Sequence, residues 1–154
     1  MIENKINILY VDDEEHNLMS FKATFRLKHN VVIALSGGEA LKIMEKKVFQ
    51  IIITDQRMPQ MTGIEFLERV LHLYPDPVRI LLTGYSDMNA VIDAVNKGKI
   101  YHYLAKPWIE DEINLTIKRA YEVFTDKQQI KELNEKLALS NDQLEFLLRQ
   151  KLIS

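Results

Sequence analysis

Five short apolar runs, rich in β-branched residues, constrain the fold of this chain more than any other feature. The runs lie at residues 6–11, 31–35, 51–54, 79–83 and 100–104. Each is nearly continuous in apolar residues, which is typical of parallel strands buried on both faces. Segments with helical periodicity separate them. Strands that alternate with helices predict an α/β fold with a doubly wound, five-stranded parallel sheet.

Residues with capping character precede several of the predicted helices. Ser36 is placed to cap the second helix, and Thr62 with Glu65 forms a capping box for the third. Ser86 or Asp87 is expected to cap the fourth helix. The inward face of that fourth helix is predicted to consist of Met88, Val91, Ile92 and Val95.

Length and composition exclude several classes of function. A chain of 154 residues has the size of one domain with an appendage. Its net charge of -2 gives no electrostatic reason to expect nucleic acid or an anionic membrane as a direct partner. The absence of cysteine excludes disulfides and thiolate metal sites. Because the sequence has neither a secretion signal nor a run of roughly 20 apolar residues, we expect a soluble, cytoplasmic protein.

Charged and polar residues follow the apolar runs where a ligand site is expected. Asp12 and Asp13 end the first run, Asp55 the third and Thr83 the fourth, and Lys106 follows the fifth. In doubly wound sheets, ligands bind at the carboxyl ends of the strands. Three crowded carboxylates repel one another and favour a cation, and oxygen ligands with room for water suit Mg²⁺. The pattern predicts a metal-dependent phosphate site in which one carboxylate attacks phosphorus.

Taken singly, these residues have simpler explanations. An aspartate at a strand end is more often a helix cap or a loop residue, and a lysine before proline is often only a solvated side chain. The conjunction of all five at the ends of four strands favours function. Two other phosphate-handling folds fit less well. Haloacid dehalogenase phosphatases carry a second aspartate two residues after the nucleophile, where this chain has Arg57, and dinucleotide-binding turns need glycines where it reads DDEEHN.

The sequence resembles the receiver domain of bacterial two-component response regulators over roughly residues 4–124. The segments that match are ILYVDDE, IIITDQRMPQMTGIEFL, RILLTGYSD and YLAKPW. The resemblance implies a flavodoxin-like sheet of order 2-1-3-4-5. It also implies that Asp55 is the phosphoacceptor and takes its phosphoryl group from a phosphohistidine on a sensor histidine kinase or a phosphotransfer protein.

The resemblance implies a set of metal ligands as well. Asp13 and Asp55 would bind Mg²⁺ directly, together with the backbone carbonyl of Arg57, whereas Asp12 would act through water. Mg²⁺ is thus the expected cofactor.

Further positions correspond to the switch of the family. Thr83 matches its phosphate-sensing hydroxyl, Lys106 its ion-pairing lysine and Tyr103 its reporter aromatic, although Tyr103 alone would be read as a packed strand residue. Phosphorylation adds nearly two negative charges, which can draw Thr83 inward and vacate space for Tyr103. Arg57 and Tyr85, two residues past the acceptor and past the threonine, flank the path of hydrolytic water. Because neither is an obvious base, we expect slow self-dephosphorylation.

The segment NKGKIYHYLAKPW departs from the commonest receiver pattern. Gly98 lies eight residues before Lys106, one more than usual, and Trp108 follows the proline. This variant resembles receivers joined to phosphodiesterases of the HD-GYP type or to other large signalling domains. It argues against a DNA-binding regulator.

The C-terminal segment predicts one long helix, because residues 109–154 contain neither proline nor glycine. An apolar stripe with 3-4 spacing, named here the seam, consists of Val123, Ile130, Leu133, Leu137, Leu144 and Leu147. The seam predicts a coiled coil and a homodimer through residues 123–151, despite polar flaws at Asp126, Ser140 and Lys151. The alternative is a helix that folds back on the domain. We therefore expect a receiver domain at 1–124 and, at 125–154, a coiled-coil helix that links to an output domain.

Two functions of different classes remain, and a third possibility is a helical adaptor whose acid pocket is vestigial. The first is a signalling phosphoacceptor that promotes its own phosphotransfer and slow dephosphorylation but is not an enzyme with an external substrate. It relays its state through the helix 4, strand 5 and helix 5 face to the dimerising helix. The alternative is a small Mg²⁺-dependent aspartyl phosphatase that acts on external phosphoesters.

Overall fold

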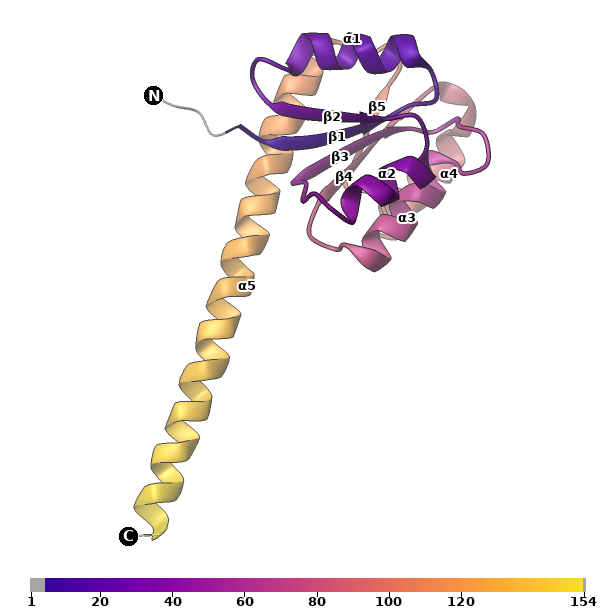
Figure 1. Ribbon diagram of the computed structural model, residues 1–154. Helices are drawn as coiled ribbons and strands as arrows, with labels where there is room; N and C mark the ends of the chain where they lie inside the picture. The colour runs from indigo at the N-terminus through magenta and orange to yellow at the C-terminus, as the bar shows by residue number, and fades with distance from the viewer. Residues whose placement is uncertain (1–4, 154) are drawn as a thin grey trace.

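The computed structural model describes residues 5–153, which form one five-stranded parallel sheet flanked by helices (Figure 1). The strand order is β2-β1-β3-β4-β5, as the sequence predicts. The strands are β1 (Asn7–Val11), β2 (Asn30–Ala34), β3 (Ile51–Asp55), β4 (Val78–Thr83) and β5 (His102–Ala105). The helices are α1 (Glu15–Phe25), α2 (Gly37–Met44), α3 (Gly63–Leu73), η1 (Tyr85–Asp87, a 3-10 turn), α4 (Met88–Asn96) and α5 (Glu110–Ile153).

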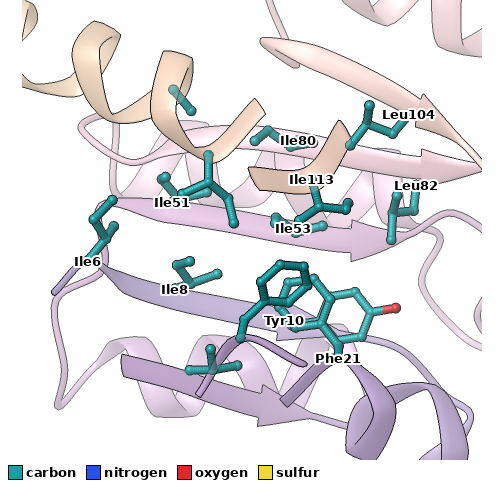
Figure 2. Close-up of a cluster of buried hydrophobic side chains, with 14 of the residues drawn as sticks. Ile6, Ile8, Tyr10, Phe21, Ile51, Ile53, Ile80, Leu82, Leu104 and Ile113 are labelled. Atoms are coloured by element: carbon teal, nitrogen blue, oxygen red, sulfur yellow. The ribbon is translucent and has the colours of Figure 1, made fainter. Parts of the chain in front are cut away.

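Both faces of the sheet are buried, which explains why its apolar runs do not alternate. Alternate residues of β1 enter opposite clusters: Ile8 and Tyr10 face α1 and α5, whereas Leu9 and Val11 face α2, α3 and α4. Figure 2 shows the first cluster, in which side chains from the strands and from α5 meet around the ring pair of Tyr10 and Phe21. The packed layers on both faces hold the central strands rigidly, and with them the edge of the sheet at which the carboxyl ends of the strands meet.

The caps of α2 and α3 are as predicted. The Ser36 hydroxyl accepts a hydrogen bond from the Glu39 amide, and Thr62 and Glu65 form a reciprocal capping box. The prediction for α4 was wrong in two respects. Asp87 precedes the helix without capping it through its side chain, and Ile92 is 46% exposed. Val91 and Ala94 are the buried residues of α4, so a small alanine takes the inward place expected for Ile92.

The fifth strand begins two residues later than expected, at His102. Ile100 is nevertheless buried outside the strand. β5 lies at the edge of the sheet and is only partly covered, which is why its residues are less buried than those of the central strands.

The last helix, α5, is continuous over 44 residues and extends well beyond the sheet (Figure 1). Its buried residues end at Ala120, and every described residue from 129 to 153 is exposed. The alternative of a helix that folds back on the domain is therefore wrong, because α5 leaves the domain as one straight element. Within residues 5–153, no helix is long and apolar enough to cross a membrane.

Candidate functional site

Parallel strands bring the predicted site residues to one edge of the sheet. Asp55 and Thr83 are the last residues of β3 and β4, and Asp12 directly follows β1. Carboxylate oxygens of Asp12, Asp13 and Asp55 all lie within 4.8 Å of one another. Because three oxygens of like charge at this spacing match the ligands that Mg²⁺ prefers, the cluster fits a divalent cation.

Asp55 is buried and paired with a lysine. Only 6% of the residue is exposed, and Lys106 Nζ lies 2.5 Å from its Oδ1 atom. Burial raises the pKa of the Asp55 carboxyl and the Asp12 charge raises it further, whereas Lys106 acts in the opposite direction. The ion pair occupies one carboxylate oxygen and leaves the second for other partners.

The loop after Asp55 is held by two residues that the sequence did not point to. The side-chain oxygen of the buried Gln56 accepts a hydrogen bond from the Ile64 amide at 2.9 Å, and the backbone carbonyl of Gln56 accepts one from the Gly63 amide at 2.9 Å. A Cβ atom at Gly63 would collide with the backbone carbonyl of Asp55. The N-terminus of α3 is thus packed directly against the main chain of Asp55, which fixes this residue in place.

Asp12 is fully buried and accepts three hydrogen bonds. Its Oδ2 atom accepts from the Tyr10 hydroxyl at 3.0 Å and from Asn17 Nδ2 at 3.2 Å, and its Oδ1 atom accepts from the Glu14 amide at 3.0 Å. By contrast, Asp13 is exposed. Burial raises the pKa of the Tyr10 hydroxyl, and the Asp12 charge raises it further, so Tyr10 stays a neutral donor. Tyr10 was not among the predicted site residues, although a tyrosine two residues before Asp12 in an apolar strand shares its face.

The two residues expected to form the switch lie on neighbouring strands, Thr83 at the carboxyl edge of the sheet and Tyr103 two residues further from that edge. Thr83 is buried at the end of β4, where its hydroxyl donates to the Gly84 carbonyl at 3.0 Å. Tyr103 lies in β5, pairs in register with Leu81 and packs, half-buried, against the second core cluster. The local hydrogen bond of Thr83 is of a kind that a phosphoryl oxygen can replace.

Arg57 makes contacts that explain why Ser86 and Asp87 do not cap α4. Its guanidinium donates to Ser86 Oγ at 2.6 Å and to Asp87 Oδ2 at 3.2 Å. The side chain thus joins the loop after β3 to η1, across the edge that carries Asp55. The side chain of Tyr85 lies outside the described part of the chain, so its predicted role stays a prediction.

Comparisons with known proteins agree with this geometry. The family model described as the response regulator receiver domain matches residues 8–118. The hydrogenase transcriptional regulatory protein HoxA of Cupriavidus necator is 33% identical over all 154 residues. This chain spans 32% of the length of that protein and 24% of HoxA from Bradyrhizobium diazoefficiens.

Two solved structures are similar over most of the chain. A structure titled adenylate cyclase from Rhodopirellula baltica has a TM-score of 0.83 and 30% identity, and covers 86% of this chain and 99% of its own. The signal receiver domain of an HD domain-containing protein from Pseudomonas fluorescens Pf-5 has a TM-score of 0.76 and 30% identity, with 84% and 96% covered.

Proposed function

The chain belongs to the response regulator receiver domain family, and on this premise we propose that Asp55 accepts a phosphoryl group from a sensor histidine kinase. The observation that carries the proposal is the pairing of the buried Asp55 with Lys106 beside two further carboxylates. One oxygen of Asp55 is bound by the lysine, and the other is the nucleophile. As it bonds to phosphorus, the bond from phosphorus to the kinase's histidine nitrogen breaks.

Receiver domains bind Mg²⁺ at their acidic pocket, and the donor set of this chain fits that ion. Asp13, Asp55 and the backbone carbonyl of Arg57 would hold it directly, with Asp12 acting through water. When bound, Mg²⁺ neutralises the oxygens of the phosphoryl group. Lys106 supplies a further positive charge on the same side, and burial excludes bulk water from Asp55.

The switch uses groups that already have exchangeable partners. A phosphoryl oxygen on Asp55 would accept the hydrogen bond that the Thr83 hydroxyl now gives to Gly84. The inward shift of Thr83 would let Tyr103 repack, which alters the surface of α4, β5 and α5. Arg57 and Tyr85, two residues past Asp55 and past Thr83, are proposed to set the lifetime of the acyl phosphate.

The exposed part of α5 is proposed to pair with a second copy of the chain. At about 100° of rotation per residue, Phe124, Gln128 and Lys131 lie roughly 130–170° from the centre of the seam. Phe124 and Gln128 line a pocket against the domain, and Lys131 Nζ lies 3.5 Å from Asp76 Oδ2. From Ile130 onward the domain thus occupies the side of α5 opposite to the seam, which leaves this part of the seam open to a partner helix. Val123, at the start of the seam, packs against the first core cluster instead.

A parallel arrangement is favoured by one pair of charges. With the seam at heptad positions a and d, Glu122 and Lys127 take positions g and e, so that Glu122 of one copy faces Lys127 of the other only in a parallel pair. We propose that residues 1–124 act as the receiver and that residues 125–154 act as the signalling helix, although α5 runs through this boundary without a break.

The output that this helix serves is proposed to be a covalently linked domain, because the curated relatives are about three times as long as this chain. One relative is named a transcriptional regulator, and one similar structure belongs to an HD domain-containing protein. The name of the transcriptional regulator does not support our expectation that the output domain is of a kind that does not bind DNA. The net charge of -2 gives this segment itself no reason to contact nucleic acid. We place the protein in the cytoplasm, where a sensor kinase presents its phosphohistidine.

Phospho-labelling tests the proposal. Acetyl phosphate or a phosphorylated kinase, with Mg²⁺, should label the protein at one phosphate per chain, as measured by intact mass. Asp55→Asn should abolish labelling, and Glu65→Gln, an exposed capping residue on α3, should not. Catalytic turnover of a generic phosphoester without stoichiometric labelling would instead support the phosphatase.

A further inference from the structure

Tyr10 is a buried polar group that the receiver function does not yet explain. It lies in the central strand β1 and is 1% exposed. Its ring stacks on Phe21 with a centroid distance of 4.1 Å and an interplanar angle of 9°. Figure 2 shows its oxygen directed toward the carboxyl ends of the strands. There the hydroxyl donates to Asp12 Oδ2, so the residue contributes to the acid site as well as to the core.

The hydroxyl changes what Asp12 can offer to a cation. A carboxylate has about four acceptor positions, two on each oxygen. Tyr10 and Asn17 fill both positions of Oδ2, and the Glu14 amide fills one position of Oδ1. One position of Oδ1 is left. Asp12 can therefore approach an ion or its bound water through a single oxygen and cannot chelate with both.

We propose that Tyr10, together with Asn17, makes the acid site prefer Mg²⁺ over Ca²⁺ by restricting Asp12 to one free acceptor position. The inference rests on the proposed Mg²⁺-dependent function. Mg²⁺ is small, takes six ligands and keeps several waters, whereas Ca²⁺ takes six to eight oxygens and often binds a carboxylate through both of its atoms. A site in which Asp12 cannot bind through both oxygens satisfies Mg²⁺ and leaves Ca²⁺ short of ligands.

Packing makes this restriction rigid. Phe21, which stacks on Tyr10, also meets Trp108 edge-on at 6.0 Å and Phe25 at 4.7 Å. The Tyr10 ring is enclosed on the strand and by α1, so its hydroxyl cannot follow Asp12 into a different geometry. Loss of the hydroxyl alone would free one position on Oδ2 without removing the ring.

The experiment is Tyr10→Phe, with Mg²⁺ and Ca²⁺ each titrated into metal-free protein by calorimetry. We expect Kd for Ca²⁺ divided by Kd for Mg²⁺ to fall about tenfold, at the low end of the contribution of a hydrogen bond to a charged group. Asn17→Ala removes the other donor to Oδ2 from a half-buried position and should shift the ratio in the same direction. This second variant keeps the test valid if Tyr10→Phe fails to fold.

Ile53→Val is the matched control. Ile53 is the register partner of Tyr10 on β3, fully buried and two residues before Asp55, as Tyr10 is two before Asp12. It should lose stability by a similar amount and keep the wild-type ratio. An unchanged ratio in the folded variants that lack a donor, or an equal shift in Ile53→Val, would overturn the inference. A wild-type protein that binds neither ion would instead overturn the proposed metal site.

Discussion

Substitution of two leucines of α5 can distinguish pairing through a specific coiled-coil seam from non-specific association. Leu137 belongs to the seam, whereas Leu139 lies two residues further on and about 150° from the seam centre. Both are 60% exposed. Leu137→Asp and Leu139→Asp therefore make the same chemical change at the same exposure on different faces of one helix.

The expected effect follows from the area that pairing would cover. From Ile130 to Leu147, the five apolar seam residues are 55–64% exposed. Full burial of a leucine or isoleucine contributes about 1.5–3 kcal/mol, so pairing would recover roughly 1–2 kcal/mol for each half-covered side chain. Ten such side chains in a dimer give roughly 10–20 kcal/mol, against an association cost of about 4–15 kcal/mol. The net gain is only a few kcal/mol, which predicts a dimer of moderate affinity.

A seam substitution acts twice in a symmetric dimer. Leu137→Asp removes two apolar contacts and places two like charges opposite each other. We expect a loss of about 3 kcal/mol or more, which raises the dimer Kd at least a hundredfold. Leu139→Asp should leave Kd within about threefold of the wild-type value, because its side chain stays in water.

Sedimentation equilibrium over a wide range of protein concentration measures all three Kd values. Circular dichroism should show that each variant keeps its domain folded, since the substitutions lie beyond the buried part of α5. Equal weakening by both substitutions would refute the seam and indicate non-specific association. A wild-type protein that stays monomeric near millimolar concentration would refute pairing altogether.

Three further predictions concern the acceptor and its loop. Because burial raises the pKa of Asp55, labelling by acetyl phosphate should weaken with falling pH sooner than for an ordinary aspartate. In metal-free buffer, falling pH should instead stabilise the folded protein, because the folded state takes up the Asp55 proton at a higher pH than the unfolded state does. The free energy of unfolding of the wild type relative to Asp55→Asn should therefore rise as pH falls through the folded pKa, which urea denaturation measures. Arg57→Ala frees Ser86 and Asp87 from the guanidinium, and the phosphate lifetime, followed by intact mass, should shorten severalfold; an unchanged lifetime would exclude Arg57 as a gate. Gly63→Ala forces a Cβ atom against the Asp55 carbonyl, and should reduce the labelling rate and lower stability by about 1–3 kcal/mol in thermal unfolding, whereas a rate equal to wild type would show that the loop adjusts freely.

The sequence predicted those features that depend on strand order and local chemistry. The five runs gave the sheet, and since parallel strands end at one edge, the gathering of Asp12, Asp13 and Asp55 followed. Ser36 and the Thr62 box were predictable because capping involves only neighbouring residues.

The features that were not predicted share one cause, which is that they depend on contacts with other elements of the fold. Asp87 looked like a cap, but Arg57, thirty residues earlier, binds it instead. Tyr10 read as one more apolar strand residue, because its hydrogen bond to Asp12 depends on a rotamer that α1 and Phe21 impose. The need for glycine at position 63 appears only when α3 packs against the Asp55 carbonyl.

The first core cluster connects the acid site to the root of the long helix. Lys106, which pairs with Asp55, is followed two residues later by Trp108, and α5 begins at Glu110. Trp108 packs against Phe21, and Phe21 against the tyrosine that holds Asp12. Movement of Lys106 on the proposed phosphorylation would therefore act on a segment that is fixed by the same aromatic group as the acidic edge of the sheet. Because α5 continues unbroken to the seam, a small rotation at its root changes the direction of the helix at its far end, where a dimer partner and a linked domain would sense it.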